Sequence, residues 1–354
     1  MRKLQRIFAA AAFCSILFAA ASCESIFEGE RDCSTKIKLE FRKHRQALQS
    51  VNGNPVDAFA STVKTVRLFV YDIQNDELVV EQFADAQQLR SEAELGIGAD
   101  NNNCLMPVDL QPGSYRIVVW CGLDQNDQNN AFALDPDARA EQYRTCNVKR
   151  SPQSGQPVNE QKYDALYHGA IAHVDVSGTG QIIPVELTKN TNDISVWVQH
   201  TTAAFGSGDY EVVYTDRNGT MKFDDNTVSG EQLEYRPHTV SMLDTSGEYN
   251  GSPVEAGAMV AHLSTARLMA DHKNEARLEV RNRQGETVFS IPFIRYLLEL
   301  QTLTADEQYY LDCEDTFNCS FHLSGDGGLW TPALIIINNW VKVPDQTGSI
   351  GAED

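Results

Sequence analysis

The chain has 354 residues, 42% of them hydrophobic, and a formal net charge of −20. Such an acidic surface repels nucleic acids and anionic lipid headgroups, so the charge excludes a nucleic-acid partner. Beyond residue 22 no stretch approaches the roughly 18 apolar residues that a membrane-spanning helix needs.

Residues 1–22 have the features of a secretion signal. Three basic residues, Arg2, Lys3 and Arg6, precede an apolar run from residue 7 to residue 21. A run of about 15 residues has the length of a signal-peptide core and is too short to cross a bilayer well. Removing this segment takes the formal charge from −20 to about −23 and leaves a chain of 332 residues.

The end of this run indicates a lipoprotein. Residues 20–22 are small and stand directly before Cys23, as lipoprotein signal peptidase requires. We therefore predict cleavage before Cys23, a lipid on its thiol and a lipidated tether over residues 23–35, which would be the only membrane anchor. Cys14 is a poorer lipidation site because it lies inside the apolar run. Ordinary secretion with cleavage near Ala21 is the alternative.

Alternation of apolar and polar residues predicts strands in the first half of the chain. Ile37, Leu39 and Phe41 alternate with charged residues, which is the period of a half-buried strand. Residues 85–95 are predicted to form a short helix, and the polar stretch 122–161 is predicted to form long loops. The other strands of this half are expected at residues 66–70, 78–83, 115–120, 170–176 and 182–188.

The second half has the same character. A second short helix is expected at residues 291–303, and strands are expected at residues 194–199, 210–215, 260–269, 276–281, 287–291, 317–323 and 334–343. Many short strands with few helices favour β-sandwiches, and one sandwich of about 330 residues would be oversized. We therefore predict an all-β chain of two domains, residues 36–189 and 190–354, divided at the polar segment Lys189-Asn190-Thr191-Asn192.

Export would place the remaining cysteines in an oxidising compartment, where disulfides form. The candidates are Cys33, Cys104, Cys121, Cys146, Cys313 and Cys319. Six cysteines allow 15 pairings, and the sequence does not choose among them. A straight strand would hold Cys313 and Cys319 about 20 Å apart, so this pair can form only if residues 314–316 make a turn.

No segment has the residue pattern of a catalytic, cofactor or metal site. The segment Gly96-Ile97-Gly98 lacks the third glycine of a dinucleotide loop, and no βαβ unit surrounds it. Asp244-Thr245-Ser246-Gly247 matches an aspartic-protease loop only with an insertion. His168 and His173 would lie on opposite faces of a strand and could not share a metal. We therefore expect no enzyme activity, no cofactor and no metal.

Four tryptophans are the aromatic residues that could stack on sugars: Trp120, Trp197, Trp330 and Trp340. Three of them lie in or beside apolar strands. We therefore expect tryptophans to pack in the core rather than to form a binding surface.

Several segments, taken in order, carry a family resemblance. They are Cys23 and Cys33, residues 66–72 (VRLFVYD), 110–115 (LQPGSY), 119–123 (VWCGL), 166–169 (LYHG), 187–192 (LTKNTN), 311–317 (LDCEDTF), 321–323 (FHL), Trp330, 335–340 (IIINNW) and Val343. In this order they resemble the FimB-type anchor lipoproteins of type V fimbriae of Gram-negative bacteria. Cys313 and Cys319 stand where that family has ordinary residues, and Asn339 replaces a usual glycine.

The resemblance implies a fold and a role. It implies two tandem transthyretin-like β-sandwich domains with short helices, and a lipid-anchored protein of the outer membrane and cell surface. It implies that the protein attaches fimbriae to the cell, has the shaft subunit (fimbrillin) as its partner and limits fimbrial length. The alternative is a surface lipoprotein that binds glycans for uptake or adhesion. A secreted hydrolase is disfavoured, because no nucleophile–base pair is present.

The resemblance also implies a mechanism for the first strand. In such fimbriae a strand of one subunit fills a groove in the next, and a shaft subunit opens that groove by proteolytic loss of its own first strand. Here the first strand, Ile37 to Phe41, follows the lipidated tether, so cutting at Arg42 or Arg45 would release the protein from its anchor. We expect the strand to stay in place, and the contact with the fimbria to use residues 334–343 or the tail 344–354.

Overall fold

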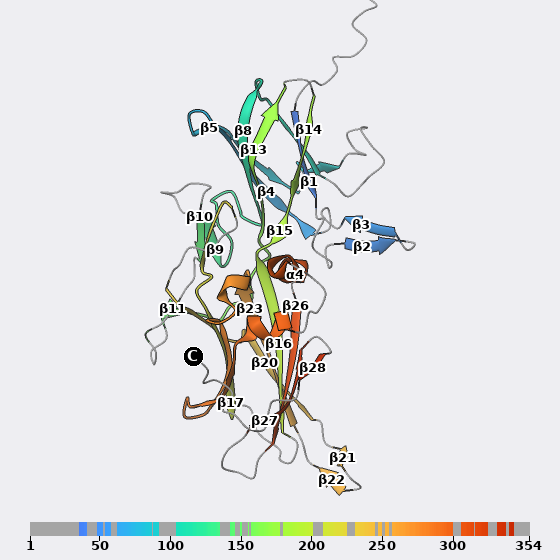
Figure 1. Ribbon diagram of the computed structural model, residues 1–354, viewed down its shortest axis with the longest axis vertical. Coiled ribbons are helices and arrows are strands. Elements are labelled where there is room, and N and C mark those ends of the chain that lie inside the picture. The colour runs from blue at the N-terminus through green and yellow to red at the C-terminus, as the bar shows by residue number, and fades with distance from the viewer. Residues whose placement is uncertain are drawn as a thin grey trace, which may run out of the picture.

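A computed structural model gives the fold. Its described residues are 35–40, 48–51, 54–57, 62–86, 88–91, 104–134, 142–145, 149–150, 155, 157–177, 180–200, 208–224, 231–244, 247–249, 252–254, 257–299, 306–314, 316–324, 331–337 and 340–342. Figure 1 shows two β-sandwiches placed one after the other along the long axis of the molecule.

The upper sandwich in Figure 1 is formed by sheets A and C. Sheet A has the strand order β14-β1-β7-β6, and sheet C has the order β15-β13-β8-β4-β5. All neighbouring strands in them are antiparallel except β1 and β14, which run parallel. Their bounds are β1 (Thr35–Glu40), β4 (Thr65–Asp72), β5 (Glu77–Asp85), β6 (Arg90–Ser91), β7 (Cys104–Val108), β8 (Gly113–Cys121), β13 (Tyr167–Val176), β14 (Ile182–Glu186) and β15 (Thr188–Lys189).

The lower sandwich is formed by two larger sheets. Sheet E has the order β11-β12-β19-β17-β24-β25, and sheet F has the order β20-β23-β16-β26-β27-β28. The strands are β11 (Lys149–Arg150), β12 (Pro157–Asn159), β16 (Thr191–His200), β17 (Tyr210–Asp216), β19 (Leu233–Tyr235), β20 (Thr239–Asp244), β23 (Gly257–Ala266), β24 (Arg277–Asn282), β25 (Thr287–Ile291), β26 (Thr316–Ser324), β27 (Thr331–Ile337) and β28 (Trp340–Lys342).

Smaller elements complete the described chain. Sheet D has the order β18-β10-β9, and two further strand pairs form separate hairpins. The bounds are β2 (Leu48–Val51), β3 (Asn54–Asp57), β9 (Phe132–Leu134), β10 (Gln142–Thr145), β18 (Thr220–Lys222), β21 (Gly247–Tyr249), β22 (Ser252–Val254), the 3-10 turn η2 (Ala270–His272), α3 (Phe293–Glu299) and α4 (Glu307–Cys313). The predicted all-β fold with short helices is confirmed.

Two apolar clusters are formed by the described residues. One lies between sheets A and C and includes Ile37, Leu39 and Val119. The other fills the lower sandwich and continues onto the opposite face of sheet C, where it includes Phe69 and Trp120. Because strand residues alternate between faces, neighbouring residues of β8 contribute to different cores. The upper and lower sandwiches therefore share apolar packing.

Sheet pairing also connects the two halves of the chain. β10 pairs with β18, and β12 pairs in parallel with β19, so that Val158 lies beside Glu234. Strands that precede residue 189 thus pair with strands that follow it. The predicted division between residues 189 and 190 stays a prediction.

The predicted helix over residues 85–95 is wrong. Asp85 and Gln88 bond reciprocally, each side chain accepting from the backbone N–H of the other at 3.0–3.1 Å. This is the bonding pattern of a helix start, and Leu89 N–H also donates to Asp85 O. The chain then enters β6 instead of continuing the helix, because Arg90 and Ser91 pair with Leu105 and Cys104.

Two other expectations are corrected. The stretch 122–161, predicted as loops, contains β9, β10, β11 and β12, whose partners lie partly far along the chain. The single strand predicted at residues 334–343 is a hairpin of β27 and β28, with Ile337 opposite Trp340. Short strands such as β10 and β12 depend on partners far along the chain, which local periodicity in the sequence does not reveal. Within the described ranges no helix has the length and apolarity to cross a membrane.

Candidate assembly site: the first strand and the buried joint

The first strand occupies an interior position in its sheet. β1 pairs on one side with β14, over Lys36–Glu40 and Ile182–Glu186, and on the other with β7, over Thr35–Leu39 and Cys104–Val108. Two further backbone bonds extend the first ladder: Lys36 N donates to Gln181 O at 2.8 Å, and Leu187 N donates to Glu40 O at 2.9 Å. Both edges of β1 are therefore bonded, and the strand leaves no open slot in sheet A.

Burial adds to the backbone bonding of β1. Ile37 and Leu39 are 0% exposed and belong to the core between sheets A and C. Thr35, Lys36 and Glu40 are also buried, so the strand is covered on both faces. If β1 left sheet A, its buried side chains would become exposed to water, and the backbone groups of β7 and β14 that face it would lose their hydrogen-bond partners. Both changes cost free energy. The expectation that the first strand is retained during assembly stays a prediction.

The second feature is the joint, by which we mean Asn190, which lies between β15 and β16, together with Thr191 and Asn192, the first two residues of β16. Asn190, Thr191 and Asn192 are all buried, although the sequence predicted a polar connection. The backbone N–H of Asn190 donates to Leu166 O at 2.7 Å. Its side-chain amide lies 3.4 Å from Met221 Sδ, and the Asn192 amide donates to Ala266 O at 3.3 Å. The joint is thus bonded to the residue that precedes β13, to β18 and to β23.

Asn218 holds the chain end of β23 beside the joint. Its side-chain amide donates to Ala266 O at 3.1 Å and to Arg267 O at 2.9 Å, and its carbonyl accepts from Tyr235 Oη at 2.6 Å. Asn218 is 0% exposed, so each of these bonds is made away from water. Ala266 O therefore receives a bond from Asn192 as well as from Asn218, which couples the joint to this network.

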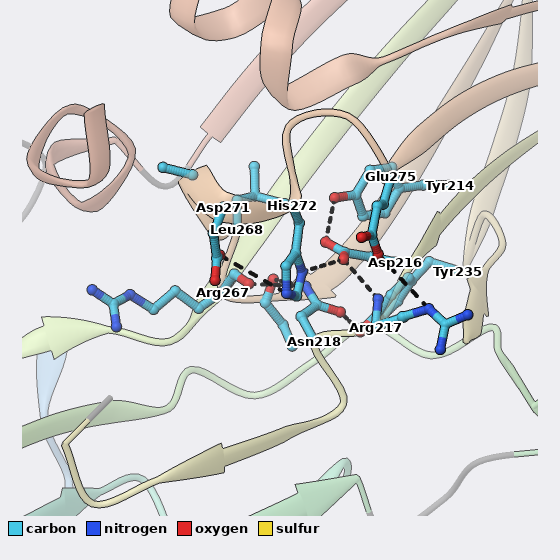
Figure 2. A network of polar contacts seen from close by, with 12 residues as sticks. Tyr214, Asp216, Arg217, Asn218, Tyr235, Arg267, Leu268, Asp271, His272 and Glu275 are labelled. Atoms are coloured by element: carbon cyan, nitrogen blue, oxygen red, sulfur yellow. Dashed lines mark hydrogen bonds and ion pairs between the residues drawn. The ribbon is translucent and has the colours of Figure 1, made fainter. Parts of the chain in front are cut away.

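Next to Asn218 lies a buried acid–histidine pair, drawn in Figure 2. Asp216 accepts from Tyr214 Oη at 2.7 Å and from the backbone N–H of Arg217 at 2.7 Å, and its Oδ1 lies 2.6 Å from His272 Nδ1. The Asp216 carboxylate raises the pKa of His272, with Asp271 and Glu275 adding to the effect, while partial burial opposes it. Burial raises the pKa of Tyr214, and the adjacent Asp216 raises it further. The contact with Asp216 therefore favours the protonated form of His272.

An ion pair fixes α4 to the same region. Arg267 binds Asp312 through two bonds, Nε to Oδ1 at 2.8 Å and Nη2 to Oδ2 at 2.6 Å, with both side chains under 10% exposed. Gln308 donates to Asp312 Oδ1 at 2.9 Å and to Leu268 O at 3.1 Å, and accepts from Ala270 N at 2.8 Å. Such a bidentate, hydrogen-bonded geometry is what a buried pair needs to offset its desolvation.

The hydrogen bonds and ion pairs of this network hold elements of the fold together. The second ring nitrogen of His272 lies 3.9 Å from Asp271 Oδ1, another acid, where a hydrolase would have a hydroxyl or thiol nucleophile. Among the described residues no group of three or more His, Cys, Asp or Glu is placed to hold a metal ion. The arrangement fixes the relative position of β16, β17, β23 and α4 rather than presenting a reactive atom.

The cysteines predicted as sites fall into two groups. Cys23, Cys33 and Cys146 lie outside the described residues, so the lipidation site and any disulfide to Cys33 or Cys146 stay predictions. Cys104, Cys121, Cys313 and Cys319 are described and buried. Cys313 ends α4 and Cys319 lies in β26 beside Val196 and Ile337. The disulfide pairing stays a prediction.

The tryptophans differ from one another. Trp120 is 0% exposed, and its ring lies 4.1 Å from that of His168, so core packing is confirmed there. Trp197 is 38% exposed, so the same expectation is wrong for this residue. It stands on the outer face of sheet F, opposite in direction to the buried Val196 and Val198. The side chains of Trp330 and Trp340 lie outside the described residues.

Sequence reasoning found the joint but missed its partners. Asn190 and Asn192 were singled out as a polar connection, yet nothing in the sequence linked them to Asn218, Asp216 or His272. These residues come from β17, the segment after it and η2, and only the folding of sheets E and F brings them together. The Asp-Arg-Asn run at residues 216–218 reads as an ordinary turn in the sequence.

Comparisons with known proteins agree on one fold. A family model described as "Fimbrillin-A associated anchor proteins Mfa1 and Mfa2" matches residues 30–345. A proposed adhesin from Bacteroides thetaiotaomicron is similar with a TM-score of 0.67 and 24% identity, over 88% of this chain and 97% of that one. A proposed polysaccharide-binding protein of the same organism has a TM-score of 0.64 and 21% identity, over 89% and 99%.

A fimbrial protein is among the similar structures. The fimbrial anchor protein Mfa2 from Porphyromonas gingivalis has a TM-score of 0.56 and 16% identity, over 87% of this chain and 99% of that one. A search of curated protein sequences returned no match. At these sequence identities the solved structures establish the fold alone. Family membership rests on the match to the family model.

Proposed function

The chain belongs to the fimbrillin-A associated anchor family, whose model spans residues 30–345, and we propose that it attaches fimbriae to the outer membrane through a lipid on Cys23 and limits their length. The family is a structural, fimbrial type and not an enzyme family. The specific partner we propose is the fimbrillin shaft subunit. Cys23 lies in the segment whose residue pattern is that of a lipoprotein signal.

The observation that carries this proposal is the interior position of β1. A subunit that accepts a strand from its neighbour needs a slot in a sheet, and β1 fills the place in sheet A that loss of the first strand would open. The strand begins at Thr35, 12 residues after Cys23, so the tether leads directly into the sheet. A chain whose first strand stays in place offers no slot to a further subunit. Growth would then end at this protein.

The joint supports the same role. A protein that holds a filament must carry force from its tether to the fimbria, and the two sandwiches of this chain share apolar packing around a buried joint. Such a connection resists bending more than an exposed linker would. The contact with the shaft would then lie in the lower sandwich, at β27 or β28, or in the tail 344–354.

Cys23→Ala tests the lipid anchor. We expect the variant to lose lipid labelling and to appear in the soluble fraction, because the lipid is the only proposed attachment. Cys14→Ala is the matched control and should remain lipidated in the membrane fraction. A Cys23→Ala protein that keeps its lipid and its membrane location would contradict the assignment.

Deletion of the gene tests the anchoring role. We expect longer fimbriae that are shed into the medium, and restoration of short, cell-bound fimbriae by the full chain. Restoration by a chain that ends at Val343 would place the shaft contact before the tail. Fimbriae that keep their length and stay on the deletion strain would refute the anchor proposal.

A further inference from the structure

Two cysteines lie in the core of the upper sandwich, on opposite sheets. Cys104 begins β7 of sheet A, and Cys121 ends β8 of sheet C. Cys104 belongs with Met106, and Cys121 with Val119, to the apolar cluster between these sheets, because alternate residues of a strand share a face. Both cysteine side chains therefore point into the space between sheets A and C, where Cys104 is 2% exposed and Cys121 is 0% exposed.

The strand registers place the two cysteines at the same end of this sandwich. Cys104 lies opposite Leu39, the last residue but one of β1. The last residue of β1 accepts a backbone bond from Leu187, at which the chain leaves β14 in sheet A and enters β15 in sheet C. β15 pairs with the start of β13, where Tyr167 lies opposite Cys121. The crossing from one sheet to the other is therefore next to both cysteines.

Close packing at this crossing brings the two sheets together. Gly169 on β13 lies opposite Val119 of β8 and shares its core side. A Cβ atom at Gly169 would lie 2.6 Å from Glu186 O and 2.8 Å from Val185 Cγ1, so the glycine allows β13 to approach β14 closely. Facing sheets usually lie about 10 Å apart, whereas a disulfide needs Cα atoms roughly 4.4–6.8 Å apart. The approach of β13 to β14 shortens the separation at the end where the cysteines face each other.

The two thiols lie within electrostatic range of each other. Burial raises the pKa of Cys121, and the neighbouring Cys104 raises it further. Repulsion between two thiolates falls with distance, so it indicates a close pair. For Cys319 in the lower sandwich, burial alone raises the pKa. Among the described cysteines, the fold thus brings Cys104 and Cys121 towards each other from facing strands.

We propose that Cys104 and Cys121 form a disulfide that links sheets A and C across the core of the upper sandwich. Both side chains are thiols in the structure, so the bond requires oxidation. The inference rests on the proposed export, because disulfides form and persist in oxidising compartments, and not on the fimbrial role. The bond would tie β7, the neighbour of β1, to sheet C, so that a pull on the tether acts on both sheets.

The oxidant is a thiol oxidoreductase of the exported compartment that carries a reactive disulfide. The thiolate of one cysteine attacks that disulfide and releases one oxidant thiolate, which leaves a mixed disulfide. The second cysteine thiolate attacks the protein sulfur of the mixed disulfide, forms the new S–S bond and releases the second oxidant thiolate. The cysteines lose two electrons to the oxidant, and their two protons end on its two thiols. Because both cysteines are buried in the fold, this exchange precedes closure of the sandwich.

Peptide mapping of the full chain tests the bond. The chain is produced with its own signal, and the cells are lysed in denaturant with N-ethylmaleimide, which blocks every thiol. We expect proteolysis without reductant to yield a linked pair of peptides that contain Cys104 and Cys121, and reduction to separate them. Maleimide on both cysteines of a chain that has lost its signal, or a bond from either one to a different cysteine, would overturn the inference.

Refolding of the purified chain separates the pairing from the export. A chain unfolded in urea and refolded with oxidised and reduced glutathione should form the same bond, whether or not the cell exports it. Its thermal midpoint should exceed that of a chain refolded in dithiothreitol by roughly 5–10 °C, because the bond closes the loop 104–121 in the unfolded state. Refolding without this bond would overturn the inference. The bond in the refolded chain, with the signal retained in cells, would support the pairing and refute the export.

Paired substitutions are the matched controls. Cys104→Ala/Cys121→Ala should lose the difference in thermal midpoint between the two refolding conditions. Cys313→Ala/Cys319→Ala also replaces two buried cysteines but should keep the difference, because these residues lie outside the upper sandwich. An equal difference in both double variants would show that the bond between Cys104 and Cys121 does not stabilise the fold and would contradict the inference.

Discussion

The first strand and the joint are both buried, but different interactions hold them. β1 is fixed by two backbone ladders and by the apolar side chains of Ile37 and Leu39. The joint is fixed by side-chain amides, and a bidentate ion pair and an acid–histidine pair lie in the network beside it. Apolar burial tolerates substitution by residues of similar shape, whereas a buried polar network fails when one partner is lost. The two regions should therefore respond differently to single substitutions.

The largest loss of stability is expected when the ion pair between Arg267 and Asp312 is broken. Asp312→Ala would leave Arg267 buried without its carboxylate and should lower the free energy of unfolding by about 3–5 kcal/mol. Urea unfolding followed by fluorescence measures the change. The double variant Arg267→Met/Asp312→Leu removes both charges and should recover most of the loss. A loss below about 1 kcal/mol in Asp312→Ala would show that the pair is effectively solvated.

A smaller loss is expected in the first strand. Leu39→Ala deletes a fully buried side chain and should cost about 3 kcal/mol, from lost burial and the cavity left behind. Limited proteolysis would report whether the strand then becomes a cleavage site. Val79→Ala, at a 46% exposed position on β5, is the control and should change stability by less than about 0.5 kcal/mol. Equal losses in the two variants would mean that β1 is not held by its apolar row.

The hydroxyl group of Tyr235 tests the hydrogen bonding beside the joint. Tyr235→Phe removes the donor to Asn218 Oδ1 and leaves a buried acceptor, which should cost about 1–2 kcal/mol. A double-mutant cycle with Asn218→Ala measures the coupling between the two side chains. Additive losses would show that the 2.6 Å bond does not stabilise the network.

The smallest effect is a pH dependence from His272. Its pKa is raised in the folded state, chiefly by the bond to Asp216, so protonation favours folding. This contribution should be complete below the unfolded pKa of about 6.5 and should disappear as the pH rises through the higher folded value.

The difference between the native chain and His272→Gln isolates this contribution. Burial lowers the pKa of His238 and His322, so these two residues oppose the trend and are present in both proteins. The native chain should lose stability relative to the variant between about pH 6 and the raised pKa of His272. A pH-independent difference would mean that Asp216 does not favour the protonated ring.

Local patterns in the sequence anticipated much of the fold. The alternation at Ile37 and Leu39 gave β1, and the similar alternation from Ala276 to Arg281 matched β24. The helix expected at residues 291–303 is present as α3, with four buried residues. These elements have strong periodicity and consist of one continuous segment, which is why they could be located without a structure.

Elements with weak local patterns were missed. β12 has three residues and depends on β19, more than 70 residues later. The segment at residues 85–95, where a helix was expected, begins with reciprocal bonds between Asp85 and Gln88, but pairing of β6 with β7 replaces the helix. In both cases a distant partner outweighed local propensity.

The sequence by itself determined the all-β character and the family, and it predicts the export signal at residues 1–22, because each depends on residue order along the chain. Only the tertiary structure decided that β1 lies inside a sheet, that Asn190 and Asn192 are buried beside Asn218, and that Trp197 faces outward while Trp120 is buried. Both tryptophans stand in apolar strands of alternating pattern. Which face of each strand meets another layer depends on how sheets C and F pack, and that packing is set by contacts between residues far apart in the chain.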